Sequence, residues 1–120
     1  MFRYRESYSA YFDKKIRSGK KKDINKIKAV KDGVDKLLRG QLQGSEFLEG
    51  EFSGKRKLHV AEKQRIIFAH CGECRQLGHD KLNQCEECQE NSDDTLRFFA
   101  FDDRDEIYET LARRQIWRHG

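Results

Sequence analysis

Two stretches of the chain carry the run of β-branched and aromatic residues that is typical of buried strands. Gln64–His70 reads Gln-Arg-Ile-Ile-Phe-Ala-His, and Thr95–Phe101 reads Thr-Leu-Arg-Phe-Phe-Ala-Phe. Each run has the length of a strand, and polar residues separate the two. The pattern predicts a β-hairpin whose connection, residues 71–94, is greatly enlarged.

A strand of a different character is predicted just before this hairpin. In Lys55–Val60 the apolar residues Leu58 and Val60 alternate with the polar residues Lys57 and His59. Successive side chains of a strand point to opposite faces of the sheet. We therefore expect Leu58 and Val60 to face the core, and Lys57 and His59 to lie on the open face.

The N-terminal part of the chain predicts a short strand and a first helix. Phe2–Arg5 alternates apolar and basic residues, as a half-buried strand does. Ser7 is a suitable N-cap for a helix over Tyr8–Arg17, in which the aromatic residues fall on one face. Ser18 and Gly19 are expected to end this helix.

Two further helices are predicted from caps and apolar spacing. The first has Asp23 as its N-cap and Gly40 as its C-terminal stop. Its apolar residues recur at helical spacing: Ile24, Ile27, Val30, Val34, Leu37 and Leu38. The last helix is expected to start at a capping box formed by Asp103 and Glu106. Its apolar side consists of Ile107, Tyr108 and Leu111.

The predicted order is strand, two helices, two strands, a cysteine-containing loop, a strand and a helix. This order is typical of an α+β domain in which an αα-hairpin packs on a small, mainly antiparallel β-sheet. With 120 residues the chain has the length of one domain, 1–120. Residues 41–54 receive no element, but Phe47, Leu48 and Phe52 within them are expected to pack against the sheet.

Charge is distributed unevenly along the chain. The net charge is +4, yet residues 1–40 hold thirteen Lys and Arg against five Asp and Glu. Residues 71–95 hold two basic residues against seven acidic ones. A basic body favours a polyanionic partner, most simply nucleic acid, while a solvated charged surface is the alternative. The candidate nucleic-acid-binding residues are Lys20, Lys21, Lys22, Lys55 and Arg56, although a lysine run at a helix junction also serves solubility alone.

Four cysteines form two pairs inside the enlarged connection. Cys71 and Cys74 are separated by two residues, as are Cys85 and Cys88, and ten residues lie between the pairs. This spacing lets two turns present four thiolates to one tetrahedral ion. It predicts a structural Zn²⁺ site without an open position for catalysis, with iron as the alternative metal. The flanking His70 and His79 are less favoured ligands that could replace a cysteine.

The location of the protein follows from what the sequence lacks. No apolar run reaches the ~20 residues that a membrane span needs, and no signal-peptide pattern is present. We therefore expect a cytoplasmic protein without a membrane partner. In that compartment paired cysteines are better explained by a metal than by disulfides.

The order of elements, together with two short motifs, resembles the RelE/ParE toxin superfamily. The first motif is a strand opening with an aligned arginine, Gln-Arg-Ile-Ile-Phe at 64–68. The second is an arginine four residues before a tyrosine, Arg104 and Tyr108. The likeness covers nearly the whole chain except residues 71–94, which look like an insertion that binds zinc.

The resemblance implies a toxin of a toxin–antitoxin system, neutralised by an antitoxin protein. In the RelE-like branch the toxin enters the ribosome and cleaves mRNA by attack of a 2′-hydroxyl, without a catalytic metal. By position, Arg65 would clamp the phosphate, and Lys57 and His59 would be the basic strand residues. Tyr108 would orient or deprotonate the attacking group, and Arg104 would bind phosphate or hold Tyr108 in place.

The resemblance leaves a second function open. Active relatives commonly carry basic residues where this chain has Asp102 and Asp103. Two carboxylates near the scissile phosphate would repel it unless they face away as helix caps. Some members of the superfamily poison gyrase and lack nuclease residues. The alternative is therefore a non-catalytic, zinc-containing module that binds nucleic acid or protein on the same fold.

Each candidate residue also has a structural explanation. Arg65 could pair with Glu62 or Glu51 on the surface, and Tyr108 could be a core aromatic of the last helix. His59 could be an idle strand residue. Arg104 could do no more than pair with Asp105 or Glu109. The functional reading requires the basic strand residues and the tyrosine to converge on one face.

Overall fold

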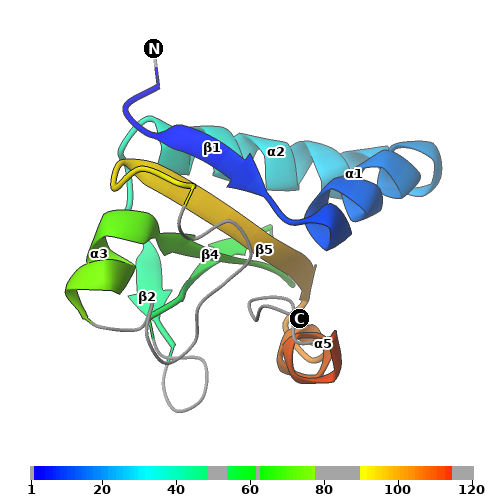
Figure 1. Cartoon of the computed structure of the whole chain (residues 1–120). Helices are drawn as coiled ribbons and strands as arrows, with labels where there is room; N and C mark the ends of the chain where they lie inside the picture. The colour runs from blue at the N-terminus through cyan, green and yellow to red at the C-terminus, as the bar shows by residue number, and fades with distance from the viewer. Residues whose placement is uncertain (1, 49–53, 62, 78–89, 115–120) are drawn as a thin grey trace.

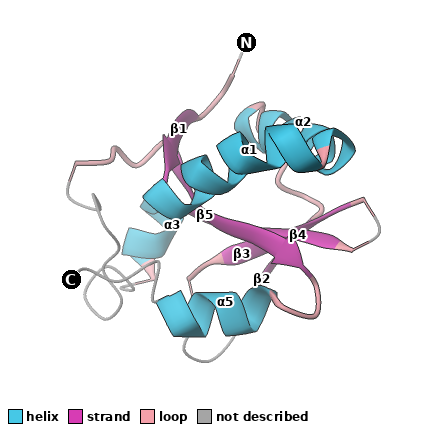
Figure 2. Ribbon diagram, turned by 90° about the vertical axis from the view of Figure 1, so that its right-hand side faces the viewer, coloured by secondary structure: helices cyan, strands magenta, loops and turns pink. Residues whose placement is uncertain are grey.

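A computed structural model describes residues 2–48, 54–61, 63–77 and 90–114. Its elements follow the chain in this order: β1 (Arg5–Tyr8), α1 (Ala10–Lys22), α2 (Ile24–Leu38), β2 (Ser45–Phe47), β3 (Arg56–Val60), β4 (Gln64–His70), α3 (Cys71–Gln76), β5 (Thr95–Asp103) and α5 (Ile107–Arg114). The strands form one sheet in the order β1-β5-β4-β3-β2. The sheet separates the α1–α2 hairpin from α5 (Figures 1 and 2).

The predicted α+β layout, with an αα-hairpin on a mainly antiparallel sheet, is confirmed. β2, β3, β4 and β5 pair antiparallel along the sheet, and β1 joins β5 in the single parallel pair among the described strands. The strand predicted at Phe2–Arg5 begins three residues later, at Arg5. No helix among the described residues is long and apolar enough to cross a bilayer.

The first helix differs from its prediction at both ends. Ser9, rather than Ser7, is its N-cap, and the Ser9 side chain accepts a hydrogen bond from the backbone N–H of Phe12. The predicted break at Gly19 is wrong, because α1 continues to Lys22. A Cβ on Gly19 would lie 2.4 Å from Ile27 Cδ1 on α2. Gly19 therefore permits a close approach of the two helices and does not end the first.

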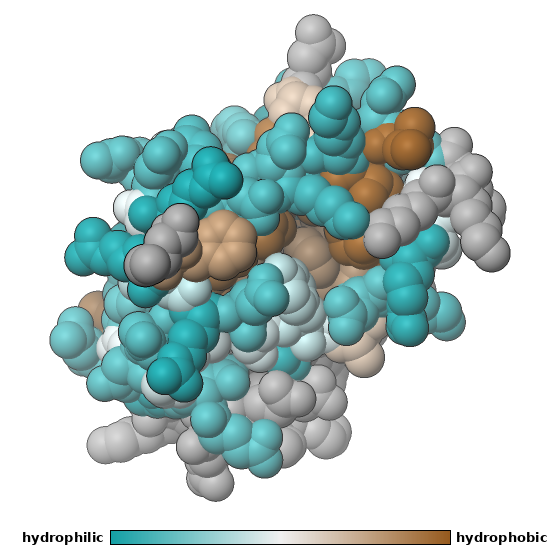
Figure 3. Space-filling view, turned by 90° about the horizontal axis from the view of Figure 1, so that it is seen from above, coloured by the Kyte–Doolittle hydropathy of each residue, from teal (hydrophilic) through white to brown (hydrophobic). Residues whose placement is uncertain are grey.

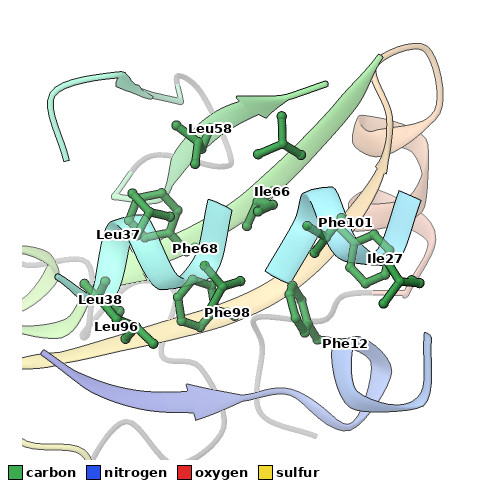
Figure 4. Packing of buried hydrophobic residues seen from close by; sticks show 13 residues of the cluster. Phe12, Ile27, Leu37, Leu38, Leu58, Ile66, Phe68, Leu96, Phe98 and Phe101 are labelled. Carbon is green, nitrogen blue, oxygen red and sulfur yellow. The ribbon is translucent and has the colours of Figure 1, made fainter. Parts of the chain in front are cut away.

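The second helix is bounded as predicted. The Asp23 side chain accepts from the backbone N–H of Lys26, and the chain leaves the helix through Gly40 at φ +101°. A left-handed φ of this kind favours glycine. One buried cluster lies between the hairpin and the sheet (Figure 4). Its members are Phe12, Ile27, Val30, Val34, Leu37, Leu38, Leu58, Val60, Ile66, Phe68, Leu96, Phe98 and Phe101.

The interior strand β5 carries a bulge that adds a side chain to the opposite face of the sheet. Phe68 pairs with Phe98, and Ile67 pairs with Ala100, so Phe99 has no partner in the register. A bulge of this kind places two successive side chains on one side of a strand. Phe99 and Ala100 accordingly both join the second apolar cluster, with Leu48, Ile67, Ala69, Ile107 and Leu111. This cluster is the surface on which α5 packs.

The stretch around the short edge strand β2 was only partly predictable. Leu48 is buried as expected, but Phe47 is half exposed and lies under the guanidinium of Arg56, whose Cζ is 4.0 Å from the ring centroid. Phe52 lies outside the described residues. The predicted capping box is wrong, because α5 begins only at Ile107 and the Asp103 carboxylate accepts from the Gln64 side chain instead.

Candidate functional site

Three predicted polar residues lie on the sheet face that α5 partly covers. Leu58 and Val60 belong to the cluster beneath the hairpin, so Lys57 and His59 on the same strand point to the opposite face. Arg65 on β4 is the direct cross-strand partner of His59. Side chains directly opposite each other in an antiparallel pair share a face. The predicted orientation of Lys57 and His59 is confirmed.

Tyr108 on α5 reaches this face and meets the strand residues. Lys57 Nζ donates to the Tyr108 hydroxyl at 3.2 Å and lies 5.8 Å from the ring centroid. Glu46 on β2 balances the ammonium of Lys57 at 3.8 Å. Tyr108 is 40% exposed, so it is not the core aromatic that the sequence left open. The phenol is therefore in contact with both the basic strand and solvent.

His59 is held in a form that can accept a proton. Desolvation and the positive charges of Arg65 and Lys57 lower its pKa below 6.5, against an opposing effect of Glu46. A histidine with a lowered pKa is neutral at physiological pH. The imidazole is exposed beside the Arg65 guanidinium. This arrangement combines a proton acceptor with a cation that can bind phosphate.

Arg65 keeps its guanidinium outside any ion pair with the described residues. Nη1 donates to the carbonyl oxygen of Gln64 at 2.9 Å, and the side chain is partly exposed. The two carboxylates suggested as structural partners, Glu62 and Glu51, lie outside the described part of the chain. Its cross-strand neighbour on β5 is Asp102.

The carboxylates that threatened to repel phosphate are each paired with a lysine, although Asp102 lies on the same face of the sheet as Arg65. Asp102 is 9% exposed, lies 3.2 Å from Lys15 Nζ and accepts from Thr110 Oγ1 at 2.9 Å. Burial alone would raise the pKa of Asp102. The backbone N–H of Asp103, the Lys15 ammonium and the Thr110 hydroxyl outweigh burial and lower this pKa. Asp103 pairs with Lys26 at 3.6 Å. Lys15 and Thr110 gave no signal in the sequence, since each reads as an ordinary helix residue.

Arg104 is not brought to the site by any contact among the described residues. It lies in the turn between β5 and α5, its side chain is 58% exposed, and Nε is 3.7 Å from the Asp105 carboxylate. Its backbone N–H donates to the carbonyl of Lys63 at 2.7 Å. The geometry matches the structural explanation given from the sequence, pairing with Asp105.

The residues predicted to bind nucleic acid differ in their exposure and in their contacts. Lys55 is 2% exposed, with Nζ 5.9 Å from the Phe99 ring centroid, so the predicted surface role of Lys55 is wrong. Arg56 is held by Glu73 through two hydrogen bonds of 3.0 and 2.7 Å. The run Lys20–Lys22 forms the last turn of α1, and its side chains lie outside the described part.

Half of the predicted metal site is described. Cys71 and Cys74 are 5% and 9% exposed and lie one turn apart on α3, which replaces the expected loop turn. Buried thiols three residues apart on a helix share a face and fit thiolate coordination. Cys85, Cys88 and the alternative ligand His79 lie outside the described residues, and within the described part no three candidate ligands meet. His70 Nδ1 is occupied as acceptor for the backbone N–H of Glu73.

A cavity of about 350 Å³ lies elsewhere, between α1, α2 and the end of β1. Figure 3 shows hydrophobic side chains in a hollow between hydrophilic ridges on this helical face. The lining residues are Tyr8, Phe12, Asp13, Ile16, Lys31, Val34 and Asp35. The sheet separates this cavity from Lys57 and Tyr108, so it takes no part in the site described above.

Known proteins match the chain in structure only. No family model matches it, and no curated protein sequence does. YafQ from E. coli strain BL21(DE3) is 19% identical over 88% of this chain and 98% of its own, with a TM-score of 0.57. The toxin–antitoxin complex RelBE2 from Mycobacterium tuberculosis matches at 15% identity, over 84% of this chain and 98% of that one, with a TM-score of 0.54. The YoeB dimer from Staphylococcus aureus matches at 12% identity, over 80% of this chain and 91% of that one, also with a TM-score of 0.54.

These matches agree with the resemblance seen in the sequence. At identities below 20% they define the fold and leave the activity open. The chain has the fold of the RelE-like toxins.

Proposed function

We propose that the protein is the toxin of a toxin–antitoxin system and acts as a ribosome-associated endoribonuclease on mRNA. The observation that carries this proposal is the convergence of Lys57, His59, Arg65 and Tyr108 on one accessible face of the sheet. The RelE-like fold supports it, and the ion pairs of Asp102 with Lys15 and of Asp103 with Lys26 offset the negative charge that would repel the phosphate.

The proposed reaction needs no metal. The 2′-oxygen attacks the adjacent phosphorus, the bond from phosphorus to the 5′-oxygen breaks, and a 2′,3′-cyclic phosphate and a 5′-hydroxyl result. His59 takes the proton of the 2′-hydroxyl, a role that its lowered pKa supports. The resemblance placed Tyr108 at the attacking group, but with His59 as the base we assign Tyr108 to the leaving group instead. Its hydroxyl gives a proton to the departing 5′-oxygen, and the Lys57 ammonium stabilises the phenolate left behind. Arg65 binds the phosphate as negative charge builds up on it.

The partners follow from this reaction. The mRNA would be cut on the ribosome, in the cytoplasm, and an antitoxin protein would hold the toxin inactive. We assign the four cysteines Cys71, Cys74, Cys85 and Cys88 to a structural Zn²⁺, for which the two buried thiols of α3 are suitable donors. Bound Zn²⁺ would cross-link the insertion, and none of the reacting groups belongs to it.

Cleavage of mRNA on programmed ribosomes by the purified protein tests the proposal. We expect cleavage that survives a chelator, and 3′ ends that carry a cyclic phosphate. Arg65→Ala should lower the cleavage rate constant by about 100-fold or more, as expected for loss of a cation at the reacting phosphate. Arg39→Ala, which removes an exposed arginine at the end of α2, is the matched control and should retain the full rate.

Two outcomes would contradict the proposal. Equal rates for Arg65→Ala and the wild type would remove Arg65 from the reaction. Absence of cleavage by folded, metal-loaded protein would favour the alternative, a non-catalytic module that binds nucleic acid or protein on the RelE-like fold. Ribosome co-sedimentation without cleavage would then identify the binding role.

A further inference from the structure

The last helix holds the proposed proton donor on one flank and a buried hydroxyl on the other. Ile107 and Leu111 of α5 are each 1% exposed and pack on Phe99 and Ala100 of β5. Because successive helical residues are about 100° apart, positions 108 and 110 lie on opposite sides of this apolar stripe. α5 therefore meets β3 through Tyr108 and meets β5 through Thr110.

Apolar packing alone leaves the rotation of α5 about its axis poorly fixed. Burial of hydrophobic surface is non-directional, so the contact of Ile107 and Leu111 with the sheet does not by itself select one rotation of the helix. A hydrogen bond, by contrast, weakens steeply when its distance and angle change. The bond of 2.9 Å from Thr110 Oγ1 to Asp102 Oδ2 joins two residues that are 8% and 9% exposed. It supplies the directional contact that the apolar stripe lacks.

The acceptor of this bond is fixed independently of α5. Asp102 Oδ1 accepts from the backbone N–H of Asp103 at 2.9 Å and lies 3.2 Å from Lys15 Nζ. Lys15 is itself held by the carbonyl oxygen of Phe101 at 2.6 Å. The carboxylate is thus anchored to β5 and α1, and both of its oxygens are used. Only Thr110 among these contacts belongs to the helix that carries Tyr108.

We propose that Asp102, acting through Thr110, is a positioning residue that holds Tyr108 against Lys57. The inference rests on the proposed function, in which Tyr108 donates the proton to the leaving oxygen. With side-chain tips about 5 to 6 Å from a helix axis, a roll of about 10° moves the tip by about 1 Å. The Lys57–Tyr108 contact of 3.2 Å would then exceed hydrogen-bonding distance. A misplacement of about 1 Å can lower a reaction rate by about 100-fold.

Thr110→Val tests this inference, because valine keeps the branched shape and removes the hydroxyl. We expect the distance from Lys57 Nζ to the Tyr108 hydroxyl to exceed 3.5 Å in its crystal structure. The single-turnover cleavage constant on programmed ribosomes should fall by roughly 100-fold, with little change in the ribosome concentration for half-saturation. Thr110→Ser, which restores a donor, should recover most of the rate. Thr95→Val is the matched control, because it also removes a buried threonine hydroxyl, here one on β5 that contacts Ser92.

The outcomes separate this inference from the proposed function. A Thr110→Val protein with the 3.2 Å contact and the full rate overturns the positioning role, and so does an equal fall in rate for Thr95→Val. If the wild type does not cleave, the proposed function fails, but the distance in the crystal structure of Thr110→Val still decides whether Thr110 holds Tyr108. Thr110→Ala is the second variant if valine prevents folding, and the same two measurements apply to it.

Discussion

Lys15 neutralises a buried carboxylate, and its replacement by methionine offers a direct test of that role. Methionine keeps a long unbranched side chain between the rings of Tyr11 and Phe101, which the Lys15 ammonium now faces at 5.7 and 5.0 Å. What it removes is the charge 3.2 Å from Asp102 and the donor to the carbonyl oxygen of Phe101. Lys15→Met therefore changes electrostatics more than packing.

The expected loss of stability can be worked out from the exposure of the pair. Breaking a fully buried ion pair from one side costs about 3 to 5 kcal/mol. The side chains of Lys15 and Asp102 are 24% and 13% exposed, so water reaches part of the pair. Water also screens that part, and we expect a cost of about 2 to 3 kcal/mol. For a domain of 120 residues this corresponds to a fall in melting temperature of about 8 to 12 °C.

The change of folding stability with pH should also differ between the wild type and Lys15→Met. The pKa of Asp102 is lowered in the folded protein, so its contribution to stability is present above its unfolded value of about 4. That contribution is lost as the pH falls through the folded value. In Lys15→Met, burial without the cation should raise the pKa of Asp102, so the variant should lose less stability than the wild type between about pH 6 and pH 3.

Urea unfolding at several pH values measures both effects. Lys14→Met, at an exposed neighbouring position of α1, is the matched control and should change stability by less than about 0.5 kcal/mol. The double variant Lys15→Met with Asp102→Asn should recover part of the loss, because it removes the unpaired charge. Equal stability of Lys15→Met and Lys14→Met at neutral pH would refute the claim that Lys15 neutralises Asp102.

Two further predictions concern the proposed reaction and the metal. The cleavage rate should rise with pH through the lowered pKa of His59, because the base works as neutral imidazole. His59→Gln should abolish this rise at the acidic end of the pH–rate profile. A pH–rate profile that His59→Gln leaves unchanged would exclude His59 as the base. Removal of metal by a chelator should lower the melting temperature and expose Cys71 and Cys74 to thiol reagents. If verified metal removal changes neither the number of thiols that react nor the melting curve, the protein has no structural metal.

Features encoded by neighbouring residues were predictable from the sequence. Asp23 and Gly40 bound α2 through interactions within a few residues of themselves, and the alternation of Lys57 with Leu58 sets the faces of β3. Gly19 misled the prediction because a glycine that ends a helix and a glycine that lets another helix approach look alike in sequence. Ile27, which decides between them, lies eight residues away on another helix.

The parts of the site that escaped prediction depend on residues distant in the chain. Lys15, Asp102 and Thr110 come from three elements, and each has an ordinary role when considered alone. Lys55 reads as a surface residue at the start of an alternating strand, yet the structure buries it over Phe99. Neither the register of β5 nor its bulge leaves a local signal, so the sequence could place candidate residues on a face but could not identify their partners.

The place of β5 in the sheet has a consequence for synthesis of the chain. β5 lies between β1 and β4, although its residues 95–103 follow the other described strands in the sequence. Until it leaves the ribosome, β1 lacks the strand with which it pairs in the described sheet, and the apolar face of the α1–α2 hairpin lacks Phe98 and Phe101. The sheet therefore closes only once residues 95–103 have been synthesised, and truncated chains that end before residue 95 should be recognised by chaperones and proteases as unfolded.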